Sequence, residues 1–201
     1  KQLELGSDLR RAFERNELVM FYQPINGMQD GRIAGFEALI RWRHPTKGIV
    51  PPGDFIPLAE ETGLIIPIGW WVIEESSRRM QAWNETRTKD RQMMMSINIS
   101  ARQFKEPGLI DRIADLIEEH HLDPSQMKLE ITESLLMDNP EVATEWLGNL
   151  KALGVSLSID DFGTGYSSLS YLHRFPFDYL KVDRSFVATM FEKRENMEIV
   201  R

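Results

Sequence analysis

The chain has 201 residues, with 24 Lys or Arg and 31 Asp or Glu, so its formal net charge is −7. This length suggests one domain of ~150 residues, alone or with a short appendage, and 42% hydrophobic with 27% charged residues is typical of a folded globular chain. The absence of cysteine excludes disulfide scaffolds, zinc–thiolate sites, iron–sulfur clusters and cysteine nucleophiles. The acidic balance argues against binding to a nucleic-acid polymer, although metals or local cations could still accommodate a phosphate ligand.

Short apolar runs predict six strands, and longer segments with apolar residues at helical spacing predict helices around them. The expected strands are residues 18–25, 33–40, 93–100, 127–132, 155–159 and 179–182. The expected helices begin after Ser7 and at about residues 54, 68, 109, 140 and 185. Ser7 and Asn139 are predicted N-caps, and Asn139 is followed by Pro140 at the first helical position. The helix after Asn139 should turn Val142, Trp146 and Leu150 inward.

The two ends of the chain suggest a fragment. Lys1 rather than Met comes first, and Arg201 lies within a helical pattern, formed by Phe186, Met190, Met197 and Val200, that no cap or glycine ends. We therefore expect residues 1–201 to be a single domain, cut from a longer protein and truncated at its C-terminus. The longest apolar stretch, residues 63–73, is too short for a membrane span, which needs ~20 residues.

The order of the elements predicts the fold class. After an initial hairpin-like pair, strands and helices alternate, which favours βαβ units with parallel strands, in either a barrel or an open doubly wound sheet. The dinucleotide fingerprint G-x-G-x-x-G and the Walker A motif are both absent, which weakens the nucleotide-binding open-sheet alternative. We predict an α/β fold, a modified (β/α)₈ TIM-like barrel. Because a complete barrel takes ~250 residues, this chain should lack roughly the last two strands.

Five of the expected strands carry an ionisable or amide side chain near the C-terminal end. These residues are Glu37, Asn98, Glu130, Asp160 and Lys181. Parallel strands are usually covered on both faces, so polar side chains there need metals, counter-charges or a ligand. In barrels, the C-terminal ends of the strands carry the active site. The alternative is a set of half-exposed antiparallel strands with one solvated face.

The residue types at these strand ends indicate hard oxygen ligands. Glu37, Asn98, Glu130, Asp160 and Asp161 would favour Mg²⁺ or Mn²⁺ over zinc or copper. Adjacent carboxylates often cap a helix or loop, but at the end of an apolar strand they could bridge two ions that activate water for phosphoryl displacement. Lys181 could orient that water or neutralise charge, and an ordinary lysine with its ammonium in solvent is the alternative.

Several short motifs recur in a characteristic order along the chain. They are YQPI (22–25), FEALIRW (36–42), NIS (98–100), EITES (130–134), DDFGTGYSSL (160–169) and KVDRSF (181–186). In order and spacing they resemble the EAL family, the cyclic di-GMP phosphodiesterase domains named after the Glu-Ala-Leu tripeptide, which begins here at Glu37. The resemblance implies a modified (β/α)₈ barrel that hydrolyses cyclic di-GMP to linear 5′-pGpG with Mg²⁺ or Mn²⁺, and that Ca²⁺ inhibits.

The resemblance also implies roles for single residues. One ion would be held by Glu37, Asn98, Glu130 and Asp160, and a second by Asp160 and Asp161. Lys181 would position the attacking water and, with Glu37 and Asp161, make up the catalytic set. The ligand would contact Gln23, Leu39, Arg41 and Asp183. Glu133 would anchor the loop that runs from Asp161, and so couple the metals to a dimer-forming region after it.

The same resemblance implies partners and competing functions. We expect a cytoplasmic domain that forms a homodimer, fused to sensory or diguanylate cyclase-like domains in a parent protein that can be tethered to a membrane. A glutamate and a glutamine that the family carries after its last two strands would lie beyond Arg201. The alternatives to the enzyme are a catalytically silent cyclic di-GMP receptor and a scaffold that acts through dimerisation. Retention of Glu37, Asp160 and Asp161 favours the enzyme.

Overall fold

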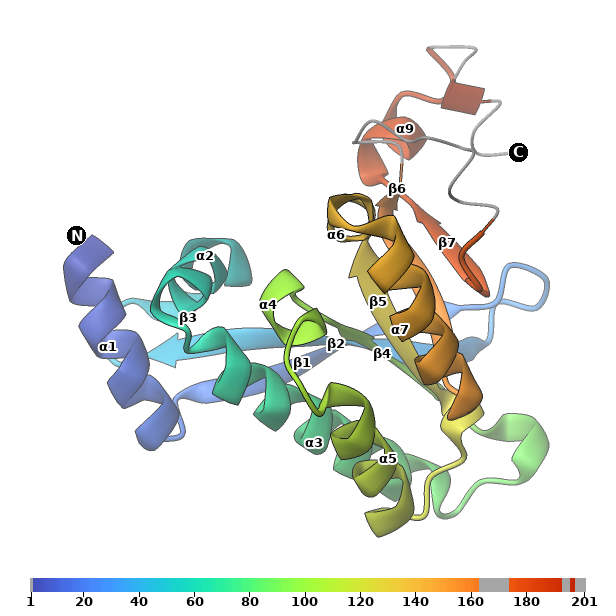
Figure 1. The fold of residues 1–201 in the computed structure, drawn as a ribbon, viewed down its shortest axis with the longest axis horizontal. Coiled ribbons are helices and arrows are strands. Elements are labelled where there is room, and N and C mark those ends of the chain that lie inside the picture. The colour runs from blue at the N-terminus through green and yellow to red at the C-terminus, as the bar shows by residue number, and fades with distance from the viewer. Residues whose placement is uncertain (1, 163–173, 193–195, 198–201) are drawn as a thin grey trace. The chain divides into compact units, whose positions relative to one another are not determined.

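The computed structural model describes residues 2–162, 174–192 and 196–197. The chain divides into two units, Lys1–Met127 and Lys128–Arg201, called unit 1 and unit 2 below. Both units combine helices with parallel strand pairs, as expected for an α/β fold, and unit 1 also contains two antiparallel pairs (Figure 1). Among the described residues, no helix is both long and apolar enough to cross a membrane.

Unit 1 is built on a hairpin that is joined to a parallel strand. Its elements are α1 (Gln2–Glu14), β1 (Leu18–Asn26), β2 (Ile33–His44), β3 (Gly48–Val50), α2 (Pro52–Thr62), α3 (Ile65–Asn84), η1 (Lys89–Arg91), β4 (Met94–Asn98), α4 (Ala101–Phe104), α5 (Leu109–Glu119) and η2 (Pro124–Gln126). Strand β2 pairs antiparallel with β1 and β3 and parallel with β4. A Cβ atom at Gly35 would lie 2.4 Å from the carbonyl oxygen of Met94, so only glycine permits this approach of β2 and β4.

The core of unit 1 lies between this sheet and helix α3, which packs against β1, β2 and β4 (Figure 1). Ile68, Ile73 and Met80 of α3 are fully buried, as are Met95 and Ile97 of β4. The apolar residues of α3 recur at three- and four-residue intervals, which places them on the one helix face that covers the sheet. Helix α2 ends before Gly63, which adopts the left-handed conformation (φ 78°) that terminates helices.

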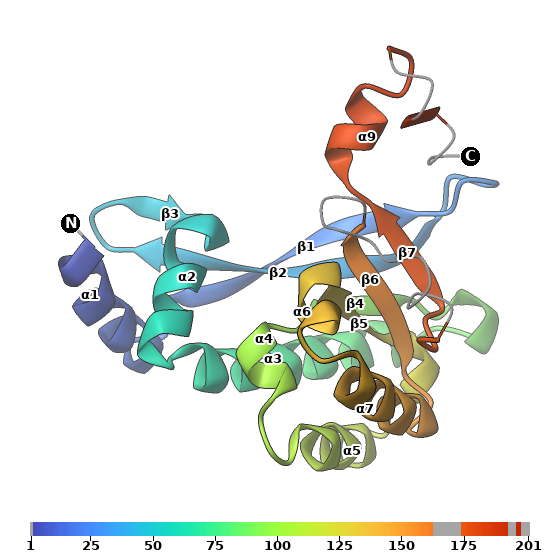
Figure 2. The same ribbon diagram turned by 45° about the horizontal axis from the view of Figure 1, so that its top comes forward.

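Unit 2 is built from three parallel strands, and two described helices lie in the connection between the first and the second strand. Its elements are β5 (Met127–Thr132), α6 (Glu133–Asp138), α7 (Pro140–Ala152), β6 (Ser156–Phe162), β7 (Tyr179–Val182) and α9 (Arg184–Ala188). Strand β6 pairs parallel with β5 and β7, and α7 packs against β6 (Figure 2). Leu129, Leu147 and Leu157 are fully buried in its core. The predicted N-cap of α7 is confirmed, since the Asn139 side chain accepts a hydrogen bond from the backbone N–H of Val142.

Three local predictions need correction. Ser7 does not cap the first helix but lies inside α1, where its hydroxyl accepts a hydrogen bond from Arg11. Val142 is exposed, because α7 buries the residues Ala143, Leu147 and Leu150 instead. The last helix, α9, ends at Ala188 rather than continuing through Met190, and residues 198–201 lie outside the described part.

Candidate functional site

Unit 1 brings together two of the predicted metal ligands. Glu37 lies in β2 and Asn98 is the last residue of β4, and the Asn98 side-chain amide donates a hydrogen bond to Glu37 Oε1 over 3.0 Å. The parallel register pairs Glu37 with Ser96, and the period of two along a strand gives Asn98 the same face as Ser96. Since the amide nitrogen is the donor here, the amide oxygen is the atom that Asn98 would offer to a cation.

The turn after Asn98 is fixed by a capping box. The hydroxyl of Ser100 accepts a hydrogen bond from the backbone N–H of Gln103, and the Gln103 side chain accepts one from the backbone N–H of Ser100. These reciprocal bonds satisfy two backbone donors at the start of α4. They also fix the backbone two residues after Asn98, so the capping box holds the end of β4 in place.

The predicted ligand contacts in unit 1 all lie on the hairpin. Gln23 is exposed and stands opposite Glu37 in the antiparallel register, and Leu39, half-buried, stands opposite Phe21. The Arg41 guanidinium lies 5.7 Å from the centre of the Phe21 ring, and its Nη1 donates to the carbonyl oxygen of Ile40 over 2.8 Å. A cation stacked on an aromatic ring keeps its charge, so Arg41 can pair with an anionic ligand.

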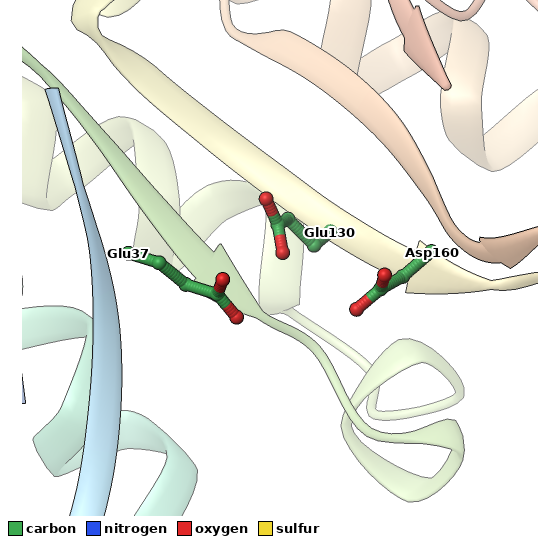
Figure 3. A group of neighbouring side chains, drawn as sticks. All are labelled: Glu37, Glu130 and Asp160. Atoms are coloured by element: carbon green, nitrogen blue, oxygen red, sulfur yellow. The ribbon is translucent and has the colours of Figure 1, made fainter. Parts of the chain in front are cut away.

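Unit 2 brings together the other predicted ligands with a lysine. Glu130 projects from β5 and Asp160 from β6, and a carboxylate oxygen of one lies within 4.8 Å of one of the other (Figure 3). Figure 3 also labels Glu37, which belongs to unit 1. The Nζ atom of Lys181, on β7, lies 2.5 Å from Glu130 Oε2 and 3.1 Å from Asp160 Oδ2. The three predicted residues therefore form one charged cluster.

In this cluster, carboxylate and ammonium groups alternate, and part of the cluster is shielded from solvent. The side chain of Glu130 is only 1% exposed, so its charge needs a compensating cation. Lys181 provides one, and a second ammonium group, that of Lys128, lies 3.7 Å from Glu130 Oε1. Two carboxylates this close together, with only oxygen as donor atoms, fit a hard divalent cation better than a thiophilic metal.

Asp161 has an unusual backbone conformation beside this cluster. Its φ of 54° lies in the left-handed region, which aspartate tolerates better than most residues, and its backbone N–H donates to Asp160 Oδ1 over 2.9 Å. The register between β6 and β7 shifts between Ile159 and Phe162. Such irregularities are common next to active sites, where they redirect a side chain. The Asp161 side chain is exposed at the strand end.

The two remaining predicted residues begin helices. Glu133 is the first residue of α6 and is 3% exposed, but the loop that it was expected to anchor falls in residues 163–173, outside the described part. Asp183 caps α9, and hydrogen bonds from the Ser185 hydroxyl and backbone N–H lower the pKa of its carboxyl group. Asp183 is therefore ionised at neutral pH.

The functional interpretation of the sequence assigned no role to Lys128. The signal was available, because Lys128 stands two residues before Glu130 in the same expected strand and must therefore share its face. The structure confirms the shared environment, with the Lys128 side chain 7% exposed next to Glu130.

Comparison with known proteins identifies the family. The sequence-family model of the EAL domain matches residues 7–201 of this chain. A Pseudomonas aeruginosa protein named bifunctional diguanylate cyclase/cyclic di-GMP phosphodiesterase MucR is 45% identical over 200 residues, which cover 100% of this chain and 29% of that protein. The Escherichia coli cyclic di-GMP phosphodiesterase PdeR is 39% identical over 199 residues, which cover 99% of this chain and 30% of PdeR. The chain thus spans less than a third of either relative.

A solved structure agrees with these relatives. The PaMucR phosphodiesterase in complex with c-di-GMP superimposes with a TM-score of 0.92 at 44% identity, covering 98% of this chain and 79% of that one. The fold is therefore the TIM-barrel-like (β/α)₈ type of EAL domains, as predicted. With the family model matching almost the whole chain and the motif acids at their strand ends, the chain belongs to the EAL domain family.

Proposed function

We propose that this chain is a metal-dependent phosphodiesterase domain that hydrolyses cyclic di-GMP to linear 5′-pGpG. The observation that carries the proposal is the cluster of Glu130, Asp160 and Lys181 at the C-terminal ends of three parallel strands. Membership of the EAL family and the cyclic di-GMP phosphodiesterase names of its relatives support cyclic di-GMP as the substrate.

The proposed metal ligands are those that the motifs predict. One divalent cation would be held by Glu37, Asn98, Glu130 and Asp160, and a second by Asp160 and Asp161. The support is chemical, because each of these residues offers a carboxylate or amide oxygen and Mg²⁺ and Mn²⁺ prefer such ligands. Ca²⁺ takes longer and more flexible coordination, which is consistent with inhibition by this ion.

In the proposed mechanism, bound cations and the side chain of Lys181 act together on the attacking water. Bound divalent cations supply positive charge that lowers the pKa of water and stabilises the phosphoryl oxygens. Lys181, already within hydrogen-bonding distance of Asp160 Oδ2, would hold the attacking water in line with the scissile bond. One P–O bond forms from water and the P–O3′ bond breaks, which leaves a 5′-phosphate and a 3′-hydroxyl.

The proposed substrate contacts are the residues that the family motifs predict. Arg41 would pair with a phosphate, because its guanidinium remains charged at neutral pH. Gln23, Leu39 and Asp183 would also contact the ligand, with Asp183 offering a carboxyl group of lowered pKa. These contacts remain predictions from the family motifs.

We also propose a wider setting for the chain. The relatives are more than three times as long as the region they share with it, and one is named a bifunctional cyclase and phosphodiesterase. Residues 1–201 would then act as one EAL-type domain beside sensory or diguanylate cyclase-like domains, on the cytoplasmic side. Dimerisation through the region after Asp161 remains a prediction from the family motifs.

The proposal is tested by chromatography of cyclic di-GMP incubated with the full-length protein and Mg²⁺ or Mn²⁺. We expect linear 5′-pGpG from the wild type and none from Glu37→Ala. Glu74→Ala, which removes an exposed acid of α3, is the matched control in unit 1 and should retain turnover. Intact cyclic di-GMP from the wild type, together with calorimetric binding of the dinucleotide, would replace the enzyme with the receptor.

A further inference from the structure

Lys128 is a buried lysine one layer below the proposed metal ligands. It lies in β5 two residues before Glu130, and its side chain is only 7% exposed. Its ammonium group lies 3.7 Å from Glu130 Oε1 and 4.9 Å from the centre of the Tyr179 ring on β7. A buried ammonium group is costly without compensation, and here a carboxylate and the face of an aromatic ring provide it.

The two oxygens of Glu130 face different cations, Oε2 in a hydrogen bond and Oε1 in a longer ion pair. Oε2 lies 2.5 Å from Lys181, whose side chain is 32% exposed and also contacts Asp160. Oε1 faces the more deeply buried Lys128. The strand direction puts Lys128 on the N-terminal side of Glu130, away from the strand end where a cation and substrate would enter.

We propose that Lys128, supported by the ring of Tyr179, is a positioning residue for Glu130. By holding Oε1, it fixes the rotation of the carboxylate and presents Oε2 to the cation. This inference rests on the proposed function, because it assumes that Glu130 is a metal ligand. Mutation of a group that contacts a metal ligand without contacting the metal typically changes metal affinity 10–100-fold.

The positioning role predicts in which direction the metal affinity changes when Lys128 is removed. The ammonium of Lys128 would also repel a divalent cation, so charge alone predicts tighter metal binding once the lysine is removed. Positioning predicts weaker binding. Measuring the dissociation constant of Mn²⁺ therefore separates the two roles without any measurement of turnover.

The experiment titrates the full-length protein, free of substrate, with Mn²⁺ and follows binding by electron paramagnetic resonance. We expect Lys128→Met to raise the Mn²⁺ dissociation constant about 10–100-fold. Lys128→Arg, which keeps the cation, should restore most of the affinity. Tyr179→Leu should weaken binding less than Lys128→Met does, because the lysine remains but loses its support.

The matched control is Lys151→Met in the same unit. Lys151 also forms an ion pair, with its Nζ 2.8 Å from Asp178, but it lies on α7, so the same substitution should leave Mn²⁺ binding unchanged. Unchanged or tighter binding by Lys128→Met would overturn the positioning role while leaving the metal site intact. A wild-type protein that binds no Mn²⁺ would overturn the proposed metal site itself. Should Lys128→Met not fold, the Mn²⁺ affinity of Tyr179→Leu decides between the two roles, because Tyr179 is 41% exposed and its replacement should not prevent folding.

Discussion

The two units hold their predicted metal ligands in different ways. In unit 1, Glu37 accepts a hydrogen bond from the neutral amide of Asn98, and Asn98 itself is exposed. In unit 2, Glu130 is almost completely buried and lies between two lysines. A single hydrogen bond from a neutral amide at a more exposed position adds little to folding, whereas a buried carboxylate between two cations is part of the folded core.

This difference separates two roles that one acidic residue can have, a role in function and a role in folding. Glu37 should matter for function much more than for folding. Glu130 should matter for both, because its removal leaves buried ammonium groups without their counter-charge. Substitution of either glutamate should therefore abolish turnover, but only substitution of Glu130 should strongly lower the free energy of unfolding.

The largest combined effect is expected from Glu130→Ala. It should abolish turnover and also lower the free energy of unfolding by about 3–5 kcal/mol, the usual consequence of leaving one side of a buried ion pair unpaired. Denaturant unfolding followed by circular dichroism measures the second effect. Glu130→Gln keeps the volume and one acceptor oxygen, so it should be less destabilising while remaining inactive. A stable Glu130→Ala variant would show that the cluster does not support the core.

Glu37→Ala should match Glu130→Ala in activity but not in stability. We expect no detectable 5′-pGpG, because a metal ligand is lost, with a change in unfolding free energy within about 1 kcal/mol, the scale of one hydrogen bond. The same chromatographic and denaturation measurements apply. Retained turnover would remove Glu37 from the metal site, and a loss of several kcal/mol would contradict the contrast between the units.

Asp161→Asn tests the second cation. Asparagine also tolerates the left-handed conformation of Asp161, so the backbone should be preserved while the charge is lost. We expect turnover to fall by orders of magnitude with little change in stability, since electrostatic stabilisation of phosphoryl transfer is lost. Kinetics across a range of Mn²⁺ concentrations measure this, and a rate equal to that of the wild type would count against a two-metal site.

Two helix caps give a smaller comparison between the units. Ser100→Ala and Asn139→Ala should each lower the unfolding free energy by about 1 kcal/mol, because each removes a side-chain N-cap. Only Ser100→Ala should also weaken Mn²⁺ binding, since its capping box follows Asn98 directly. Equal effects of the two substitutions on Mn²⁺ binding would show that the capping box has no part in positioning Asn98.

The smallest expected effect concerns Asp183. Hydrogen bonds from Ser185 lower the pKa of this exposed carboxyl group, so its stabilising contribution is present above the ordinary aspartate pKa of 3.8 and is lost as the pH falls through the lowered value. Ser185→Ala should return the pKa toward the ordinary value, which an NMR titration of the Asp183 carboxyl would detect. An identical titration curve in the variant would mean that the hydroxyl makes no contribution.

Much of the fold could be predicted because strand signals are local. The bounds expected for β5 and β7 are those observed, since apolar residues recur at every second position in each strand and turn or cap residues flank it. Strand β3 was missed because its three residues carry no alternating pattern and are ordered by pairing with β2. The prediction that Val142 lies on the inward face of α7 was wrong. Val142 and Leu150 are eight residues apart and therefore point in different directions around the helix, whereas Ala143, Leu147 and Leu150 lie on one face.

The candidate site was predictable in its residues but not in its contacts. Alternation along the strands was enough to select Glu130, Asp160 and Lys181, which the structure brings together. Alternation also places Lys128 on the face of Glu130, but it could not reveal that the Lys128 ammonium lies over the Tyr179 ring, because that contact depends on where β7 lies relative to β5. Nor could it reveal the φ of Asp161, since a backbone dihedral angle is set by the register shift in β6.

The left-handed conformation of Asp161 has a consequence for the evolution of such domains. Only glycine, asparagine and aspartate adopt this conformation readily, and a single nucleotide change converts an aspartate codon into either of the others. A duplicated gene could therefore lose the charge at this position in one step while its product still folds. If Asp161 holds a metal, descent from an enzyme to a silent receptor needs no unstable intermediate at this position.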